Sequence, residues 1–436
     1  MNQHPRPTWH RRDFLRTSAL AGTGFWVSGS VHGAESKSPN EKLNVACIGI
    51  GGRGAHNVAG VETENLVAFC DVDEQRAAPT LKKFPKVKLY QDFRKMLEER
   101  KDIDAVVVST PDHTHAPASV MAMRLGKHVY CEKPLAHELN EARLMASLAV
   151  EKKLATQMGN QGHSSEAYRH VVGLVQNGAI GTVREVHAWC HKNFSADGRP
   201  TGTHPVPPTL NWDLWLGPAP ERPYHSAYLP FNWRGWNHFG TGGLGDMACH
   251  ILDPIFWSLE LRSPKRVTAA GERPTEEGFS SKFTVRYDFD ARGDLPPVSV
   301  KWYTGYSTPD VKLEDGINIP RQGQLFIGDK GMLLSGHTGG LVALLPQKSF
   351  SGFQAPENTI AKSLGHHAEW IAACKNGTPT GSNFPYGAAL TEAVLLGNIA
   401  NRVGQPLDWD SANLKITNLP DSQQYLSRQY RAGWTL

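Results

Sequence analysis

Residues 43–73 read LNVACIGIGGRGAHNVAGVETENLVAFCDVD, and this stretch decides the fold. An apolar run at 45–48 is followed by a glycine-rich turn, a short helical segment and a second apolar run that ends at Asp71. A strand, a tight glycine turn, a helix and a second strand make half of a nucleotide-binding Rossmann fold. We therefore expect an α/β protein whose N-terminal domain is a doubly wound parallel sheet.

The glycine-rich turn has the residue types that a dinucleotide-binding loop requires. Gly49 lets the chain turn sharply, Gly51 lets the main chain approach a pyrophosphate, and Gly54 lets the helix pack closely on the sheet. The pyrophosphate then lies at the positive end of the helix dipole. The predicted cofactor contacts in this loop are Gly49, Ile50, Gly51, Gly52, Arg53 and Gly54.

A carboxylate follows the second strand, about 20 residues beyond the glycines. At this position Asp71 is expected to accept hydrogen bonds from the adenosine ribose hydroxyls. A carboxylate also repels a ribose phosphate, while Arg76 offsets part of that repulsion. The predicted cofactor is therefore NAD, with NADP as the less favoured alternative.

Later strands of the same domain end in polar sequences, and in a doubly wound fold such ends meet at the cofactor-binding edge of the sheet. The apolar strand at 103–109 runs into STPDHTHAP (109–117), where Thr110, Pro111, His113 and His115 are predicted cofactor contacts. Two other interpretations of the histidines stay open. They are a cap for the next helix and a metal pair, for which the sequence offers no third ligand of matching spacing.

The strand HVYCEKP (128–134) carries Glu132 and Lys133 ahead of a proline, which cannot continue the ladder. Both are predicted cofactor contacts. Lys133 is expected to project into the crevice, where it can bind a ribose hydroxyl or polarise a reacting oxygen. Asn160 and Gln161 follow the last strand of the domain and are predicted at the nicotinamide end.

Taken together, GIGGRG, Asp71, STPDHTHAP and the Cys-Glu-Lys-Pro sequence at 131–134 resemble the Gfo/Idh/MocA family, named for glucose-fructose oxidoreductase, inositol dehydrogenase and a rhizopine-catabolism oxidoreductase. In that family a D-x-x-x-H helix supplies the catalytic pair, and residues 246–250 read DMACH. The resemblance implies that His250 is the general base for a hydroxyl proton and that Asp246 orients the substrate or the histidine. It implies that Lys133 binds the cofactor ribose and the reacting oxygen.

The helical spacing itself places Asp246, His250 and Asp253 on one face, at i, i+4 and i+7, with Asp253 in a structural role. Ahead of this helix, residues 194–239 form an insertion rich in tryptophan and proline. Indole faces suit the C–H faces of sugar rings, so Trp233, Arg234 and His238 are predicted to bind substrate together with Lys133, Asp246 and His250. A loop that packs its own aromatics, or a subunit contact, is an equal alternative.

The second half of the chain alternates apolar and polar residues in runs at 182–192, 266–272, 282–289, 298–303 and 324–328. These runs lack a strand–helix–strand rhythm, which predicts a C-terminal α+β domain with a large open, mainly antiparallel sheet. The expected boundaries are 42–160 for the Rossmann domain, 161–410 for the substrate and oligomerisation domain, and 411–436 for a polar tail.

The composition excludes several classes of protein. The chain has 436 residues and a net charge of +4 without blocks of lysine and arginine, which argues against nucleic acid as a partner. No apolar run reaches the roughly 18 residues of a membrane span. The six cysteines form no C-x-x-C pair and are predicted to be free thiols.

Residues 1–35 are predicted to be a twin-arginine signal peptide, because HRRDFLR at 10–16 precedes a mildly apolar run at 17–31. This predicts a periplasmic or other extracytoplasmic protein that carries its NAD along.

We therefore predict an NAD(P)-dependent oxidoreductase that acts on a secondary alcohol of a sugar, polyol or glycoside. A redox glycosidase with tightly bound NAD and a non-catalytic carbohydrate-binding protein are the alternatives. The resemblance suggests a homodimer or homotetramer.

Overall fold

The computed structural model describes residues 41–436, except 306, 315, 338–339, 356 and 358–359. The predicted signal peptide lies outside the described residues. Within the described part of the chain, no helix is both long enough and apolar enough to cross a membrane.

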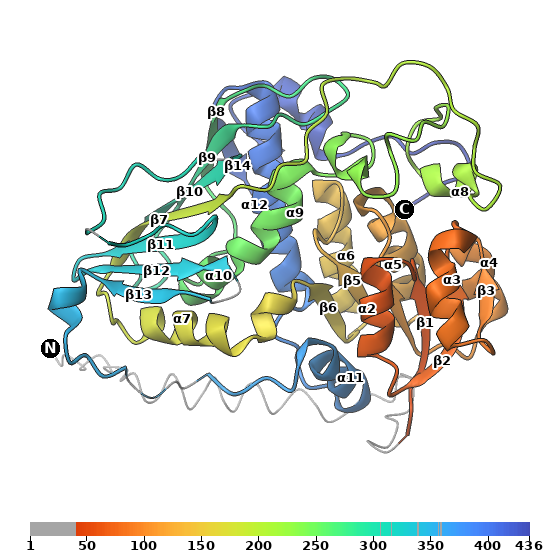
Figure 1. Ribbon diagram of the computed structural model, residues 1–436, viewed down its shortest axis with the longest axis horizontal. Coiled ribbons are helices and arrows are strands. Elements are labelled where there is room, and N and C mark those ends of the chain that lie inside the picture. Colours follow the sequence, from red (N-terminus) through yellow and green to blue (C-terminus); the bar gives the residue numbers. More distant parts are fainter. Residues whose placement is uncertain (1–40, 306, 315, 338–339, 356, 358–359) are drawn as a thin grey trace, which may run out of the picture. The chain divides into compact units, whose positions relative to one another are not determined.

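The first domain is built on a six-stranded parallel sheet with the strand order β3-β2-β1-β4-β5-β6 (Figure 1). Its strands are β1 (Asn44–Ile48), β2 (Asn65–Cys70), β3 (Lys88–Tyr90), β4 (Ala105–Val108), β5 (His128–Glu132) and β6 (Thr156–Gly159). Its helices are α2 (Arg53–Gly60), α3 (Glu74–Lys83), α4 (Phe93–Glu99), α5 (His115–Arg124) and α6 (Leu139–Glu151). The predicted Rossmann sheet is confirmed.

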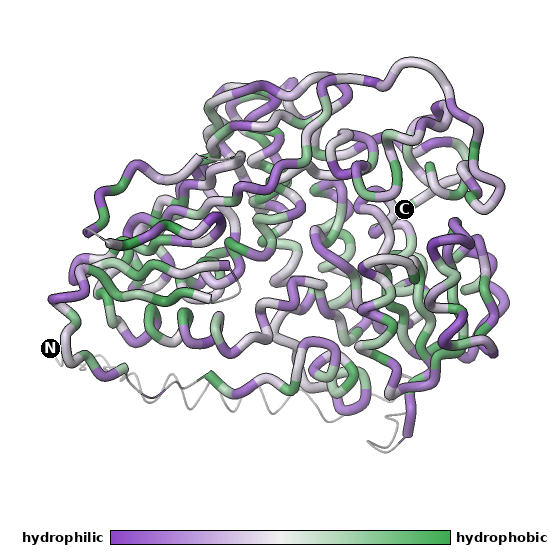
Figure 2. Tube along the Cα trace, in the orientation of Figure 1, coloured by the Kyte–Doolittle hydropathy of each residue, from purple (hydrophilic) through white to green (hydrophobic). Residues whose placement is uncertain are grey.

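The sheet holds together because its central strands are apolar on both faces. All four residues of β4, AVVV, are buried, and helices cover the sheet on either side. Ile48 pairs with Cys70 on one side and with Val108 on the other, so β1, β2 and β4 end at the same level. This register brings Gly49, Asp71 and Ser109 to one edge of the sheet. Figure 2 shows the hydrophobic residues concentrated along the strands.

The second domain contains a nine-stranded sheet with the order β13-β12-β11-β7-β10-β9-β8-β14-β15. Only β7 and β10 pair in parallel among these strands, so the predicted mainly antiparallel sheet is confirmed. The strands are β7 (Val183–Cys190), β8 (Arg266–Gly271), β9 (Phe283–Phe289), β10 (Val298–Thr304), β11 (Gln322–Gly328), β12 (Met332–Gly336), β13 (Val342–Leu345), β14 (Leu407–Asp410) and β15 (Lys415–Ile416).

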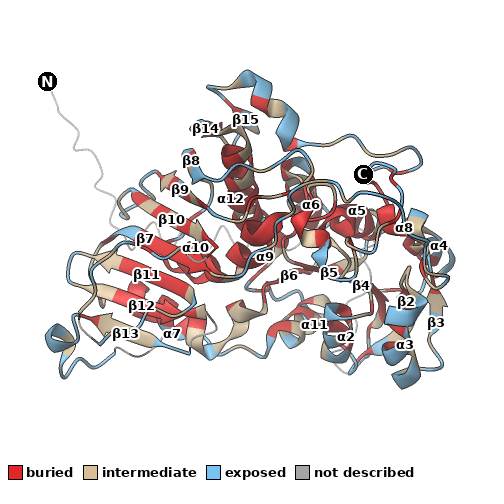
Figure 3. Ribbon diagram, turned by 45° about the horizontal axis from the view of Figure 1, so that its top comes forward, coloured by how far each residue is buried: buried red, intermediate tan, exposed pale blue. Residues whose placement is uncertain are grey.

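Helices join the two sheets. The long helix α12 packs against α6 of the Rossmann domain and against α9, β8 and β9 of the second domain. Figure 3 shows buried residues along α9 and α12 and exposed residues on α3. The helices of this domain are α7 (Glu166–Gln176), α8 (Trp212–Leu216), α9 (Gly242–Ile251), α10 (Asp253–Ser258), α11 (His366–Asn376) and α12 (Phe384–Val403). The two domains therefore share a continuous core.

Two expectations from the sequence differ from the structure. Asp253 does not continue the face of Asp246 and His250, because α9 ends at Ile251 and Asp253 starts α10. Pro254 lies in the first turn of α10 and has no N–H to extend α9. The expected polar tail at 411–436 is also folded: it contributes β15 and returns to the Rossmann domain, where Trp434 packs on Phe93.

Candidate active site

A cavity of about 650 Å³ lies at the carboxyl edge of the Rossmann sheet. Its walls come from the glycine loop and the ends of β2, β4 and β5, from α9, and from the insertion between β7 and α9. Residues of both predicted domains therefore face one space.

The glycine loop forms a main-chain cradle at the start of α2. Gly49 has a φ of +76°, and a Cβ added there would lie 2.8 Å from the Ser109 main chain. A Cβ at Gly54 would lie 1.8 Å from the Gly49 carbonyl oxygen, so only glycine allows α2 to approach this closely. The first turn of α2 presents amide donors, which suit an anion such as a pyrophosphate.

The Asp71 carboxylate binds this loop. It accepts hydrogen bonds from the main-chain amides of Ile50 at 2.9 Å, Gly51 at 3.3 Å and Asp73 at 3.0 Å. Burial raises the pKa of Asp71, although these amides oppose the shift. Because Asp71 also lines the cavity, it can accept further hydrogen bonds from a ligand hydroxyl.

Two buried polar atoms of predicted cofactor contacts have no hydrogen-bond partner among the residues described. They are the Thr110 hydroxyl, which lines the cavity, and the Asn160 side-chain nitrogen. Unpaired buried donors are costly unless a ligand satisfies them. The cradle, the carboxylate and the Thr110 hydroxyl together fit a dinucleotide.

Glu132 organises the middle of the cavity. One of its oxygens accepts hydrogen bonds from Arg53 at 3.1 Å, Asn57 at 2.9 Å and Gln161 at 2.8 Å. The glycine loop, α2 and the end of β6 are thus tied to the end of β5, directly before Lys133.

Lys133 and Asp246 form an ion pair across the domain boundary. The Lys133 ammonium donates hydrogen bonds to the Asp246 carboxylate at 2.6 Å and to the Asp246 main-chain carbonyl at 2.9 Å. Arg234 donates to the same carboxylate oxygen at 2.8 Å. Burial alone would raise the pKa of Asp246, but the two cations outweigh it and hold that pKa well below its usual range. Asp246 is therefore ionised.

Of the two roles predicted for Asp246, orienting the substrate or the histidine, no hydrogen bond to His250 accompanies the second, and the carboxylate binds the two cations instead. His250 lines the cavity, and its ring lies 5.6 Å from the ring of His337 between centroids. Burial, and then the charge of Lys133, hold the pKa of His250 well below its usual value. His250 is therefore neutral and able to accept a proton.

The sequence interpretation missed His337. It follows β12 and lines the cavity beside His250, and its Nδ1 lies 2.8 Å from the hydroxyl of the buried Tyr168. Burial and the charges of Lys192 and Lys133 lower the pKa of His337 to about 4. The site thus contains two neutral imidazoles. No local motif marked this histidine, because it meets His250 only through the packing of the nine-stranded sheet on α9.

Most of the predicted site residues line the one cavity, and five of the predicted cofactor contacts do not. Those lining it are Gly49, Gly51, Gly52, Arg53, Asp71, Thr110, Pro111, Glu132, Lys133, Gln161, Trp233, Arg234, Asp246 and His250. Ile50 is buried and contributes its amide to Asp71, Gly54 packs on Gly49, and Asn160 accepts a hydrogen bond from Ser382.

His113 and His115 were predicted as cofactor contacts, but their side chains do not line the cavity. The ring nitrogens of His113 lie 3.2 and 2.9 Å from the carbonyl oxygens of Phe239 and Trp215. Those of His115 lie 2.8 Å from the carbonyl oxygens of Pro134 and Thr110. Both imidazoles are buried and tie loops together, so neither reaches the cavity.

The insertion packs its own aromatics. Trp212 stacks on Trp215 with 4.9 Å between ring centroids, and Trp215 meets Phe239 at 4.7 Å. His238 lies outside the cavity lining, and burial and the Arg222 guanidinium lower its pKa to about 4. Only Trp233 and Arg234 of the predicted substrate contacts in the insertion face the cavity, where the guanidinium lies 4.3 Å from the indole centroid.

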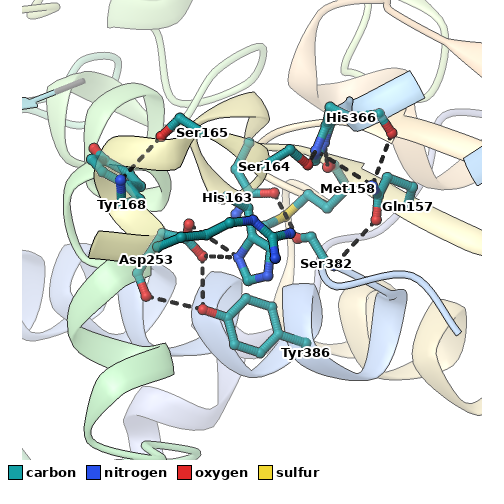
Figure 4. A network of polar contacts seen from close by, with 12 residues as sticks. Gln157, Met158, His163, Ser164, Ser165, Tyr168, Asp253, His366, Ser382 and Tyr386 are labelled. Carbon is teal, nitrogen blue, oxygen red and sulfur yellow. Dashed lines mark hydrogen bonds and ion pairs between the residues drawn. The ribbon is translucent and has the colours of Figure 1, made fainter. Parts of the chain in front are cut away.

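A buried polar network lies behind the cavity (Figure 4). His163 Nδ1 lies 2.9 Å from the Asp253 carboxylate, which also accepts a hydrogen bond from the Tyr386 hydroxyl at 2.7 Å. His366 lies 2.7 Å from the Met158 carbonyl oxygen. The network ties the end of β6 to α10 and to the start of α12, so it supports the junction of the two domains.

Over the described residues, no group of three or more histidine, cysteine, aspartate or glutamate side chains is arranged to hold a metal ion. The six cysteines are free and mostly buried, as predicted.

A dinucleotide cradle and several titratable side chains face one cavity, which is the arrangement that a dinucleotide-dependent oxidoreductase requires. Comparison with protein families agrees. Residues 43–160 match the model of an oxidoreductase family with an NAD-binding Rossmann fold, and residues 169–293 match the C-terminal alpha/beta domain of that family. The chain belongs to the Gfo/Idh/MocA family, and its N-terminal domain is an NAD-binding Rossmann domain.

The sequences of curated relatives match part of this chain. A levoglucosan dehydrogenase from Pseudarthrobacter phenanthrenivorans is 25% identical over 278 residues, which cover 60% of this chain and 62% of that protein. A glycosyl hydrolase family 109 protein from Saccharopolyspora erythraea is 31% identical over 202 residues, 40% of this chain and 44% of that protein. The matched regions thus span less than two thirds of either relative.

The fold is also similar to that of a levoglucosan dehydrogenase in complex with NADH and levoglucosan. The two structures superpose with a TM-score of 0.57 at 18% identity, covering 84% of this chain and 99% of the other. This likeness is one of fold.

Proposed function

We propose that this protein is an NAD-dependent oxidoreductase that removes hydride from a secondary alcohol carbon of a sugar, polyol or glycoside. One observation carries the proposal: Lys133, Asp246 and His250 share a single cavity with the glycine cradle and Asp71. The dehydrogenase relative and the NADH-bound fold neighbour, both named for levoglucosan, support a carbohydrate substrate.

His250 serves as the general base. NAD, when bound, supplies the hydride acceptor at its nicotinamide ring. The uncharged His250 takes the proton of the substrate hydroxyl as the carbinol carbon loses its hydride. Because its pKa lies below the usual value, the imidazole is available as a base at neutral pH without prior deprotonation.

Lys133 stabilises the reacting oxygen. An ammonium has three donors, and Asp246 accepts two of them. The third is left for the substrate oxygen, on which negative charge develops as the proton leaves. Asp246 thus orients Lys133, and Arg234 keeps Asp246 ionised.

A glycosidase with no net redox change is the second candidate, and His337 favours it. In that reaction, oxidation of a ring carbon acidifies the proton on the neighbouring carbon, the glycosidic bond is lost by elimination, water adds, and hydride returns. Such a sequence needs a proton acceptor at each of two adjacent carbons, and the cavity has two neutral imidazoles. The partial match to a glycosyl hydrolase family 109 protein agrees with this option.

We also propose that the protein is exported by the twin-arginine route to the periplasm and works as a homodimer or homotetramer. The HRRDFLR sequence at 10–16 supports export. Fusing residues 1–40 to a reporter that is active only outside the cytoplasm tests it, and loss of export after R11K/R12K substitution is the expected result.

The test of function uses the purified full-length protein with levoglucosan, myo-inositol, free sugars and nitrophenyl glycosides. Absorbance at 340 nm reports NADH, and nitrophenol release reports glycoside cleavage. NADH formation with an alcohol substrate supports the dehydrogenase, whereas nitrophenol release without net NADH supports the redox glycosidase.

His250→Gln is the decisive variant, and His170→Gln, at an exposed histidine on α7, is its matched control. Turnover should fall at least about 100-fold in the first and stay unchanged in the second. If carbohydrate binds to both variants and neither the wild type nor the control turns it over, the protein is a binding protein and the proposal is wrong.

A further inference from the structure

Two segments from outside the Rossmann domain cover the end of the cavity next to Asp71. The first, the crossing segment (residues 209–217), comes from the insertion. It pairs with the chain directly after Asp71: Asn211 N donates to the Val72 carbonyl at 2.8 Å, and Glu74 N donates to the Thr209 carbonyl at 3.0 Å. In Figure 1 the crossing segment carries α8, which lies above α3 and α4 in this view.

The second is the C-terminal segment (residues 428–434). It is fastened to the crossing segment by Arg431, whose guanidinium donates to the Gly217 carbonyl at 3.1 Å and pairs with the Asp213 carboxylate. It is fastened to the Rossmann domain by Arg94, which donates to the Gly433 carbonyl at 3.0 Å. The segment therefore bridges α4 and the insertion.

The Trp434 side chain lies between α4 and the insertion. Its ring lies 5.9 Å from the Phe93 ring, and the Arg94 guanidinium lies 4.2 Å from the indole centroid. Phe93 follows β3, and the Asp71 amide donates to the carbonyl of Tyr90, the last residue of that strand. Trp434, Phe93 and Asp71 line the same cavity, so the indole belongs to its ribose-binding end.

We propose that Trp434 is a cofactor-binding residue that stacks on the adenine of NAD, and that the two segments retain NAD between turnovers. An adenine ring offers a flat aromatic face, and nucleic-acid bases stack on aromatic side chains such as indole. NAD covered in this way leaves only when the C-terminal segment separates from Phe93 and from the crossing segment. The inference rests on the NAD assignment of the proposed function.

Retention has a chemical consequence. NADH that does not leave must be reoxidised on the protein, with hydride passing to a carbonyl group. That group belongs either to a second substrate, which is reduced to an alcohol, or to the oxidised intermediate of the first. The fold at the adenosine end thus favours a closed redox cycle over exchange with a pool of free NAD.

The experiment measures NAD itself, without a sugar substrate. The full-length protein is purified without added nucleotide, gel-filtered and denatured, and the released NAD is quantified. The protein is then loaded with NADH, and its release is followed by NADH fluorescence during a chase with excess NAD. Trp434→Ala, Trp434→Phe and Tyr425→Ala are compared with the wild type, since Tyr425 is an exposed aromatic outside the cavity lining.

We expect near-stoichiometric NAD in the wild type and in Tyr425→Ala. We expect little NAD in Trp434→Ala, with NADH release at least about tenfold faster, which is about 1.4 kcal/mol of lost binding. Trp434→Phe keeps an aromatic ring, so its NAD content and its NADH release rate should be intermediate. This variant therefore separates lost stacking from misfolding. Release at the wild-type rate from Trp434→Ala overturns the inference while leaving the proposed function intact. Failure of the wild type to bind NADH at all overturns both.

Discussion

The Lys133 ammonium and the Asp246 carboxylate lie 2.6 Å apart, although 113 residues separate them in the chain. Lys133 directly follows β5 of the Rossmann sheet and Asp246 lies on α9 of the second domain, so the pair exists only when the two domains are packed together. Since Asp246 also accepts from Arg234, its single negative charge is shared by two cations in the cavity.

Asp246→Asn is expected to damage both activity and stability. It leaves two partly buried cations without their counter-charge, and breaking a buried pair in this way costs about 3 kcal/mol. Urea unfolding monitored by circular dichroism measures the loss, and kcat/KM should fall at least about 100-fold because Lys133 is no longer oriented. The control is Asp290→Asn, whose exposed pair with Lys265 should contribute nothing measurable. Equal stability of the two variants would contradict the role given to Asp246.

The activity of the wild type should persist into mildly acidic solution. The pKa of His250 lies well below its usual value of 6.5, so the base stays unprotonated as the pH falls through that value. We expect kcat/KM for the identified substrate to be nearly constant from pH 8 to 6.5 and to decline only at lower pH. An acid limb centred at pH 6.5 would show that His250 has an ordinary pKa or is not the base.

His337 should make stability depend on pH. Its folded pKa of about 4 is below the usual 6.5, so the unfolded chain binds more protons between these values. The contribution of His337 is therefore fully present above pH 6.5 and is lost as the pH falls toward 4. The free energy of unfolding of His337→Gln, measured from pH 7 to 4, should fall less steeply than that of the wild type. His170→Gln should reproduce the wild-type slope.

Asp71→Ser tests the ribose assignment. It removes a charged acceptor for the ribose hydroxyls and so should raise the Kd for NAD at least about tenfold. The ratio of NADP to NAD affinity should rise at the same time, because the repulsion of a ribose phosphate is lost. Titration with each dinucleotide measures both constants. Unchanged NAD affinity would rule out Asp71 as the ribose acceptor.

Gly54→Ala tests the cradle. The added methyl group would lie 1.8 Å from the Gly49 carbonyl oxygen, so α2 must move away from β1. We expect a loss of about 1–3 kcal/mol in unfolding free energy together with weaker NAD binding. Gly198→Ala provides the comparison, because a Cβ there meets nothing within 4 Å and the variant should match the wild type in both measurements.

The sequence by itself determined the Rossmann domain and its half of the site. Gly49, Gly54 and Asp71 could be placed at the edge of the sheet because their positions depend on neighbours within about 25 residues, where strand and turn patterns are readable. Lys133 could be predicted to face the crevice because it follows an apolar strand ahead of a proline. The mainly antiparallel second sheet was predictable from alternation in its strands, and the D-x-x-x-H helix from family resemblance.

Only the tertiary structure decided which side chains meet across the cavity. His337 reaches His250, and Trp434 reaches Phe93, through contacts between segments that are remote in sequence. The STPDHTHAP motif predicted cofactor contacts for His113 and His115. It did not indicate that main-chain carbonyl groups of other segments would contact both rings. The packing of the nine-stranded sheet on α9 fixes the first contact, and the bonds of Arg94 and Arg431 fix the second. Both depend on the packed volume of the whole core, which no local pattern of residues encodes.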